Sequence, residues 1–236
     1  MNLKDKTLEE RLYATRAFPA IITGEVGTGK TSAIEMLSDE EKKRTLIISY
    51  DGKSMPLDTD DMYFKVRYID DTFDVIKSIN SIKNAIAHED VDRVIIDTLS
   101  GFAKELQIYS SKNFRGFEVY NNFNNEMDEF LKMLRVEVRA HGKLVYMLAH
   151  YPVYEKKGES RKAIASVGSK HGNGTYESIV NTVIEATMED GRFFFKADNT
   201  DEFDTTRIRR DLSPYKSKTN SLQEFEEFIT QPRVVK

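Results

Sequence analysis

The chain has 236 residues, of which 39% are hydrophobic and 31% are charged, so one large domain with a substantial core is expected. The net charge of −4 argues against a protein that is basic throughout, although it leaves room for a local basic patch. The absence of cysteine excludes disulfides and thiol chemistry, and no apolar run is long enough for a membrane span or a signal peptide, so we expect a cytoplasmic protein without a membrane partner.

The first residues lead into a strand. Residues 1–17 are polar and predict a short helical lead-in. Residues 18–23 are apolar, with proline only near the start, which is the place where a strand tolerates it. We expect a single domain over residues 1–212, followed by a C-terminal tail over residues 213–236 that contains a short helix.

A glycine-rich loop follows this strand, with two glycines four residues apart and then lysine and threonine. This pattern is typical of a loop whose backbone N–H groups bind the phosphates of a nucleoside triphosphate. We expect Lys30 to reach the β- and γ-phosphates and the Thr31 hydroxyl to bind Mg²⁺. Residues 32–37 predict a helix whose N-terminal dipole favours the same anion. The predicted nucleotide-binding residues are Gly24, Glu25, Val26, Gly27, Thr28, Gly29, Lys30, Thr31 and Ser32.

Two further strands and a helix are predicted next. Residues 45–50 form an apolar run that predicts a buried strand, and Asp51-Gly52 predicts a turn at its end. Apolar and polar residues alternate enough over residues 63–69 to predict a strand. The apolar residues over 73–87 have the spacing of an amphipathic helix.

Residues 93–97 form a second apolar run, which ends in Asp97. A buried parallel strand of this kind delivers its last carboxylate to the edge of the sheet where ligands bind. We therefore expect Asp97 to bind Mg²⁺ opposite Thr31.

Residues 101–120 are rich in aromatic and basic side chains. Bases stack on aromatic rings while lysine and arginine hold phosphates, so this composition suits a single-stranded nucleic acid. The alternative is a helix and loop whose aromatic rings pack on the core. The residues concerned are Tyr109, Lys112, Phe114, Arg115, Phe117 and Tyr120.

Residues 121–138 predict an amphipathic helix that ends at Gly142, and residues 143–150 predict the next buried strand. His150 ends this strand, beside the expected position of Asp97. It could sense the γ-phosphate, and a purely structural role at the strand end is an equal alternative.

Residues 153–175 predict a long loop with four glycines and more basic than acidic residues. Its charge favours contact with a phosphate backbone, and a solvated loop is the alternative. The candidate contacts are Lys156, Lys157, Arg161, Lys162 and Lys170.

A hairpin is predicted after this loop. Asp190-Gly191 separates two apolar runs, residues 181–187 and 192–197, and such a pair is a strong hairpin signal. The tail contains a capping box from Ser221 to Glu224 that predicts a short helix.

The order of these parts resembles the RecA-like ATPases over roughly residues 15–212. The compact form is similar to the phage-encoded RecA-like proteins implicated in single-strand annealing and recombination. The resemblance implies an α/β P-loop NTPase fold with a mostly parallel twisted sheet, flanking helices and a C-terminal hairpin. It implies ATP and Mg²⁺ as cofactors, single-stranded DNA as partner, and homo-oligomers with ATP at subunit interfaces. Recombination or replication proteins would act beside it in the host cytoplasm.

The resemblance also implies roles for individual residues. Asp51 lies where the family has the carboxylate that activates water, although RecA itself has glutamate there. His150 lies where RecA has a glutamine that links the γ-phosphate to a DNA-binding loop. Residues 101–120 and 153–175 correspond to the two DNA-binding loops. Lys196 lies where such assemblies place a cation in the active site of a neighbouring subunit. Arg207 matches such a position more weakly.

Two other functions remain open from the sequence. One is an ATP-gated scaffold or loader with little turnover, and the other is a nucleotide kinase. The sequence does not decide whether the partner is DNA or RNA, or whether ATP or GTP is preferred. It also leaves open whether the subunits form filaments, rings or dimers.

Overall fold

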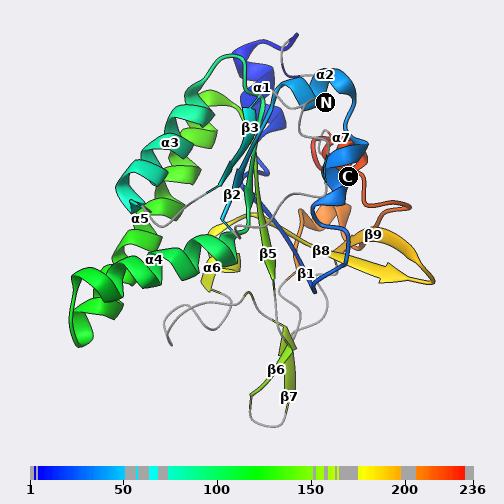
Figure 1. The fold of residues 1–236 in the computed structure, drawn as a ribbon. Coiled ribbons are helices and arrows are strands. Elements are labelled where there is room, and N and C mark those ends of the chain that lie inside the picture. Colours follow the sequence, from blue (N-terminus) through cyan, green and yellow to red (C-terminus); the bar gives the residue numbers. More distant parts are fainter. Residues whose placement is uncertain are drawn as a thin grey trace.

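A computed structural model places an eight-stranded sheet at the centre of the molecule (Figure 1). It describes residues 3, 5–50, 57, 64–68, 74–150, 153–156, 159–162, 164, 175–197 and 206–231. The strand order is β10-β9-β8-β1-β5-β4-β2-β3. The run from β8 to β3 is parallel, and β9 lies antiparallel between β8 and β10. The predicted α/β fold, with its mostly parallel sheet and C-terminal hairpin, is confirmed.

The strands of the central sheet are short. They are β1 (Ala20–Gly24), β2 (Thr45–Ser49), β3 (Phe64–Tyr68), β4 (Arg93–Asp97), β5 (Leu144–His150), β8 (Thr182–Glu189), β9 (Arg192–Ala197) and β10 (Tyr215–Lys216). Every residue of β1, β2 and β4 is buried, as expected for parallel strands that are covered on both faces.

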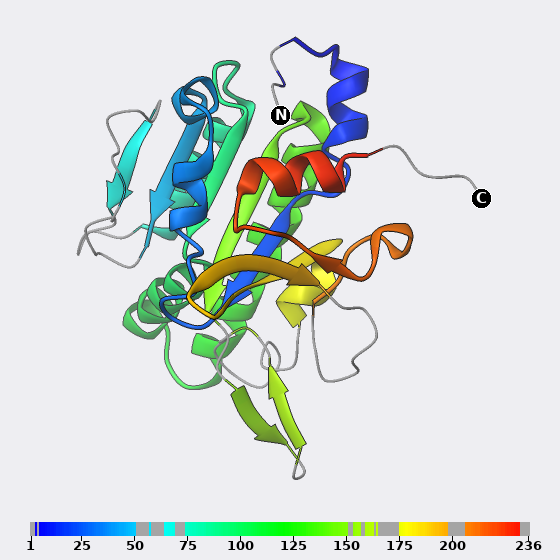
Figure 2. The same cartoon turned by 90° about the vertical axis from the view of Figure 1, so that its right-hand side faces the viewer.

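Helices cover both faces of the sheet. They are α1 (Leu8–Ala14), η1 (Ser32–Met36), α2 (Asp39–Lys43), α3 (Val75–Ala87), α4 (Leu99–Asn113), α5 (Phe117–His141), α6 (Thr175–Ile179), η3 (Arg210–Leu212) and α7 (Leu222–Ile229). Figures 1 and 2 show α3, α4 and α5 on one face and α2 and α7 on the other. None of the helices in the described part of the chain is long and apolar enough to cross a membrane.

The longest helix, α5, forms because apolar residues recur on one side of it. Phe123, Met127, Phe130 and Leu134 are buried against the sheet and α4. Gly142 ends the helix with a φ of 59°, a conformation that glycine adopts without strain. The predicted helix and its terminator are both present.

The hairpin of β8 and β9 has the predicted turn. Asp190 and Gly191 have φ values of 50° and 73°, as a type I′ turn requires. The turn matches the twist of the two strands and sets their register.

The tail beyond residue 212 packs into the same core as the rest of the chain. Strand β10 pairs with β9, and α7 buries Leu222, Phe225 and Ile229. Glu226 of α7 is fully buried and binds the guanidinium of Arg93 on β4 through two contacts of 2.7 and 2.6 Å. The C-terminal helix is therefore tied to a central strand.

The helix predicted after the glycine-rich loop is shorter than expected. It is η1, a 3₁₀ helix of five residues. Leu37 is extended, and Ser38 forms a capping box with Glu41 that starts α2. The length of η1 is therefore limited because Leu37 ends it and Ser38 starts a new helix at once. We assign no role to the dipole of η1.

Residues 101–120 follow the helix-and-loop alternative, and the described part of residues 153–175 contains strands. Residues 99–113 form α4 and α5 begins at Phe117, so little of residues 101–120 is loop. The described part of residues 153–175 contains an antiparallel hairpin of β6 (Val153–Lys156) and β7 (Glu159–Lys162), followed by the first residue of α6. Figure 1 shows this hairpin extending away from the sheet.

Candidate functional site

The glycine-rich loop lies at the carboxyl end of β1, between β5 and β8 of the sheet. Gly24 has a φ of 153°, and a Cβ atom there would lie 2.4 Å from the carbonyl oxygen of Ala186. Gly29 has a φ of 78°. Only glycine fits both the space at the first position and the backbone at the second without strain.

Lys30 is held inside this loop. Its ammonium donates to the carbonyl oxygens of Gly24, at 2.9 Å, and Glu25, at 2.6 Å, and the residue is 6% exposed. Burial lowers the pKa of Lys30 to about 8, although the carboxylates of Asp97 and Glu25 oppose this shift. The loop therefore fixes a cation that a polyphosphate could share.

The structure brings Thr31 and Asp97 together across the site. Thr31 Oγ1 lies 3.2 Å from Asp97 Oδ2, and Asp97 is 5% exposed at the end of β4. A hydroxyl and a carboxylate are hard oxygen donors, and Mg²⁺ is usually bound by one or two carboxylates together with substrate phosphates. This donor set fits Mg²⁺.

His150 ends β5 directly beside the loop. It is paired in register with Gly24 of β1, and its backbone N–H donates to Ser100 Oγ at 3.1 Å. The end of β5, the start of the loop and the start of α4 therefore meet at one edge. A role for His150 in sensing phosphate stays a prediction.

The position predicted for the catalytic carboxylate is only partly defined. Strand β2 ends at Ser49, which is paired with Asp97, and the N–H of Tyr50 donates to the carbonyl of Asp97 at 2.7 Å. Asp51 itself lies outside the described residues. Its role as the base stays a prediction.

The predicted nucleic-acid contacts fall on two parts of the fold. Lys156 lies on β6 and Arg161 and Lys162 lie on β7, whereas Lys157 and Lys170 are outside the described residues. Lys112 lies near the end of α4, and Arg115 follows in the turn to α5.

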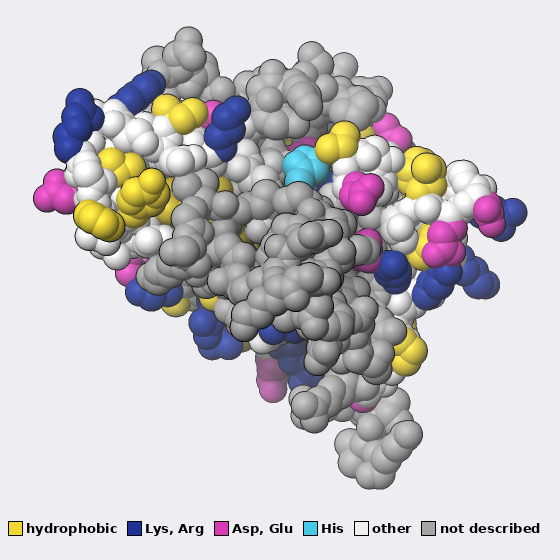
Figure 3. All heavy atoms as spheres, turned by 90° about the horizontal axis from the view of Figure 1, so that it is seen from below, with side chains coloured by type: hydrophobic (Ala, Val, Ile, Leu, Met, Phe, Trp, Pro, Cys, Tyr) yellow, Lys and Arg dark blue, Asp and Glu magenta, His cyan; other side chains and the backbone are white. Residues whose placement is uncertain are grey.

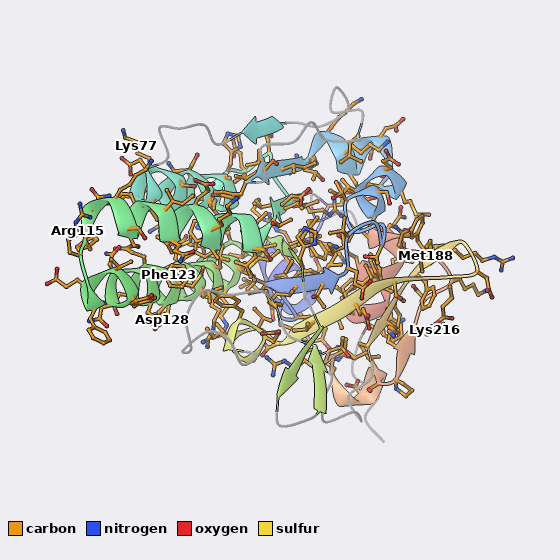
Figure 4. The ribbon with its side chains drawn as sticks, turned by 60° about the horizontal axis from the view of Figure 1, so that its bottom comes forward. Lys77, Arg115, Phe123, Asp128, Met188 and Lys216 are labelled. Carbon is orange, nitrogen blue, oxygen red and sulfur yellow. The ribbon has the colours of Figure 1, made fainter. Side chains whose placement is uncertain are left out.

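The end of the α4–α5 pair presents exposed aromatic and basic side chains. Phe117 is 87% and Tyr120 is 51% exposed, and Arg115 donates to the carbonyl oxygens of Ser111 and Phe114. Figure 3 shows hydrophobic side chains beside Lys and Arg at this end, and Figure 4 shows Arg115 there, opposite Met188 and Lys216. Phe117 and Tyr120 are thus largely free for a partner.

Lys196 lies on β9, next to a buried carboxylate of its own sheet. Its Nζ is 3.1 Å from Glu185 Oε2 of β8. Arg207 donates to the carbonyl of Val180 at 2.7 Å, and burial lowers the pKa of this guanidinium. Both cations therefore have partners within the subunit, and action in a neighbour's site stays a prediction.

Sequence reasoning missed Asn220, which contacts the loop from the C-terminal segment. Its Nδ2 donates to the carbonyl of Gly29 at 2.7 Å, across 191 residues of sequence. The only nearby signal was the capping box that begins at Ser221, and this predicts a helix rather than a contact with the loop.

Comparison with known proteins adds a family to this geometry. A protein-family model described as an AAA domain matches residues 17–208. A KaiC-like protein from the hyperthermophilic archaeon Pyrococcus horikoshii is similar in structure at 16% identity, with a TM-score of 0.47 over 84% of this chain and 82% of that chain. A RadB recombinase is similar at 12% identity, with a TM-score of 0.49 over 75% of this chain and 78% of that chain. No curated protein matches the chain.

Proposed function

This chain belongs to the AAA domain family of ATPases. From that membership we propose that it hydrolyses ATP with Mg²⁺, and from its surface we propose that it acts on single-stranded DNA. The observation that supports hydrolysis best is the convergence of Lys30, Thr31 and Asp97. A buried ammonium, a hydroxyl and a carboxylate meet at the mouth of a glycine-rich loop. This is the arrangement that phosphoryl transfer needs, because its catalysis rests on positioning and charge.

In the mechanism that we propose, water attacks the γ-phosphate in line with the leaving oxygen. Thr31 and Asp97 would hold Mg²⁺, which would supply positive charge near the phosphates. Lys30 moves its hydrogen bonds from the loop carbonyls to the β- and γ-phosphates and stabilises the developing charge. Asp51 orients or deprotonates the water, and His150 relays the state of the γ-phosphate to the segment that follows β5.

The DNA-binding proposal rests on two regions that the fold presents away from the core. The end of the α4–α5 pair exposes Phe117 and Tyr120 beside Lys112 and Arg115, which suits stacked bases and phosphates. The hairpin of β6 and β7 carries Lys156, Arg161 and Lys162. We add Lys157 and Lys170, which lie outside the described residues, to the proposed contacts. We propose that subunits assemble with ATP between them and that Lys196 leaves Glu185 to reach a neighbour's γ-phosphate.

We place this activity in phage-type recombination, annealing or replication, beside partner proteins in the host cytoplasm. ATP hydrolysis should rise when single-stranded DNA is added. Because salt screens contacts to phosphates, the stimulation should weaken as ionic strength increases. Steady-state phosphate release with and without single-stranded DNA, together with sizing of the particles, tests this.

Alanine at Lys156, Lys157 and Lys162 together should remove the stimulation by DNA. A matched triple variant with alanine at Lys43, Lys77 and Lys132, which are exposed elsewhere, should keep it. Equal stimulation of both triple variants would argue against this DNA surface. ATP binding without turnover, with or without DNA, would favour a scaffold or loader, and phosphate transfer to an added nucleoside monophosphate would favour a kinase.

The affinity for ATP should fall as the pH rises above about 8. The free protein holds Lys30 with a pKa of about 8, and bound phosphates favour its charged form. Binding above that pH therefore requires uptake of a proton, which costs up to about tenfold in affinity per pH unit. Phosphate itself has its second pKa near 6, so the ligand's charge is constant between pH 7.5 and 9.5. A dissociation constant that stays flat over this range would contradict the role of Lys30.

A further inference from the structure

The C-terminal segment holds the glycine-rich loop from outside. Asn220 Nδ2 donates to the carbonyl of Gly29 at 2.7 Å and lies 3.4 Å from the hydroxyl of Ser32. Asn220 is 7% exposed, so water competes little for its amide. The contact joins two segments that are 191 residues apart in sequence.

This hydrogen bond acts on the peptide unit that bears the Lys30 N–H. The carbonyl of Gly29 and the N–H of Lys30 belong to one planar trans peptide, so they point in opposite directions. A donor that fixes the carbonyl outward therefore aims this N–H toward the space that the loop encloses. The Ala33 N–H and the Ser32 hydroxyl also donate to the same carbonyl, both at 3.1 Å, and Asn220 makes the shortest of the three contacts.

The surroundings of Gly29 support a tight fit on this side. A Cβ atom at Gly29 would lie 2.8 Å from Asn220 Nδ2 and 3.0 Å from the ring of Phe193. The C-terminal segment and the β8–β9 hairpin thus pack directly against the backbone of the loop.

Asn220 is itself anchored by α7. The next residue, Ser221, caps this helix by accepting from the N–H of Glu224. One helical turn further on, Glu226 binds Arg93 of β4, the strand that also supplies Asp97. The amide of Asn220 is therefore fixed relative to both halves of the site.

We propose that Asn220 is a positioning residue that presets the peptide between Gly29 and Lys30 for polyphosphate. It does not contact the reacting atoms. The inference rests on the ATP binding proposed above, because it concerns how the same loop is held ready. It gives the C-terminal segment a role in nucleotide affinity, although this segment lies outside the glycine-rich motif.

The test compares binding of ATP and of inorganic tripolyphosphate, each with Mg²⁺, to the full chain. Asn220→Ala should weaken both affinities by about fivefold, which corresponds to the net free energy of one hydrogen bond. Asn220→Asp, which is nearly the same shape, should weaken both further because a carboxylate faces the Gly29 carbonyl and adds negative charge near the phosphates. Thermal melting without ligand should change little in Asn220→Ala, because Ala33 and Ser32 still donate to the Gly29 carbonyl.

Gln223→Ala is the matched control, because it removes a carboxamide from the same segment that bonds only Glu227 among the described contacts. It should leave both affinities unchanged. Loss of ATP affinity with full tripolyphosphate affinity would overturn the proposal, since Asn220 would then act on the nucleoside. Unchanged affinities in both Asn220 variants would also overturn it. Failure of the unmodified chain to bind ATP would instead reject the proposed function.

Discussion

Replacing Lys30 by alanine should lower the rate of ATP hydrolysis by about a hundredfold to a thousandfold. Negative charge spreads over the γ-phosphate during transfer, and a fixed cation in a site with little water stabilises it strongly. The loop already holds this cation through the carbonyl oxygens of Gly24 and Glu25, so little reorganisation is needed. Steady-state phosphate release at saturating ATP measures the loss.

The same variant should melt at or above the wild-type temperature at pH 7. Burial lowers the pKa of Lys30 to about 8 from its usual 10.5, so the unfolded chain binds this proton more tightly than the folded one. The charge itself therefore opposes folding below that pH, and this offsets the two hydrogen bonds to Gly24 and Glu25 that alanine removes. A lost rate with an intact melting temperature would separate loss of charge from misfolding. An unchanged rate would refute the assignment of the loop.

The parts of the site that sequence predicts best are those specified within a few residues. The loop from Gly24 to Thr31 needs glycine where φ is positive and where backbone approaches closely, and this need is visible as a motif. Asp97 was predictable because an apolar run delivers its last residue to the edge of a parallel sheet. The turn at Asp190 and Gly191 follows from the same kind of local rule.

The parts that sequence did not predict depend on distant contacts or on competing local signals. Asn220 meets Gly29 only because α7 folds back over η1, and no local pattern encodes that. Residues 101–120 resembled a DNA-binding loop by position, but Thr98 caps α4 by accepting from the N–H of Gly101 and the helix continues to Asn113. The helix-and-loop alternative therefore describes this segment better than the analogy of position.

Replacing Glu226 by alanine should lower the free energy of unfolding by about 3–5 kcal/mol. Arg93 is 1% exposed and Glu226 is fully buried, and the guanidinium also donates to Thr45 Oγ1 at 3.1 Å. Burial disfavours the charged guanidinium, but Glu226, Tyr146 and Glu41 together outweigh it and raise the pKa of Arg93. Alanine would leave this cation and the hydroxyl of Tyr146, which donates to Glu226 at 3.0 Å, without their principal acceptor. Urea denaturation measures the change.

The Arg93–Glu226 ion pair should contribute far less to the free energy of unfolding than the loss in Glu226→Ala suggests. Desolvation of two charges offsets most of their attraction, so replacing both Arg93 and Glu226 by methionine should restore much of the stability that Glu226→Ala loses. Glu129→Ala is the control, because it breaks an exposed pair with Lys132 and should cost less than about 1 kcal/mol. If Glu226→Ala proved as mild as this control, α7 would not be held to the sheet through Arg93. If the double methionine variant proved as unstable as the single one, the Arg93–Glu226 pair itself would stabilise the fold, and the loss in Glu226→Ala would not come from a buried cation left with only the 3.5 Å contact to Glu41.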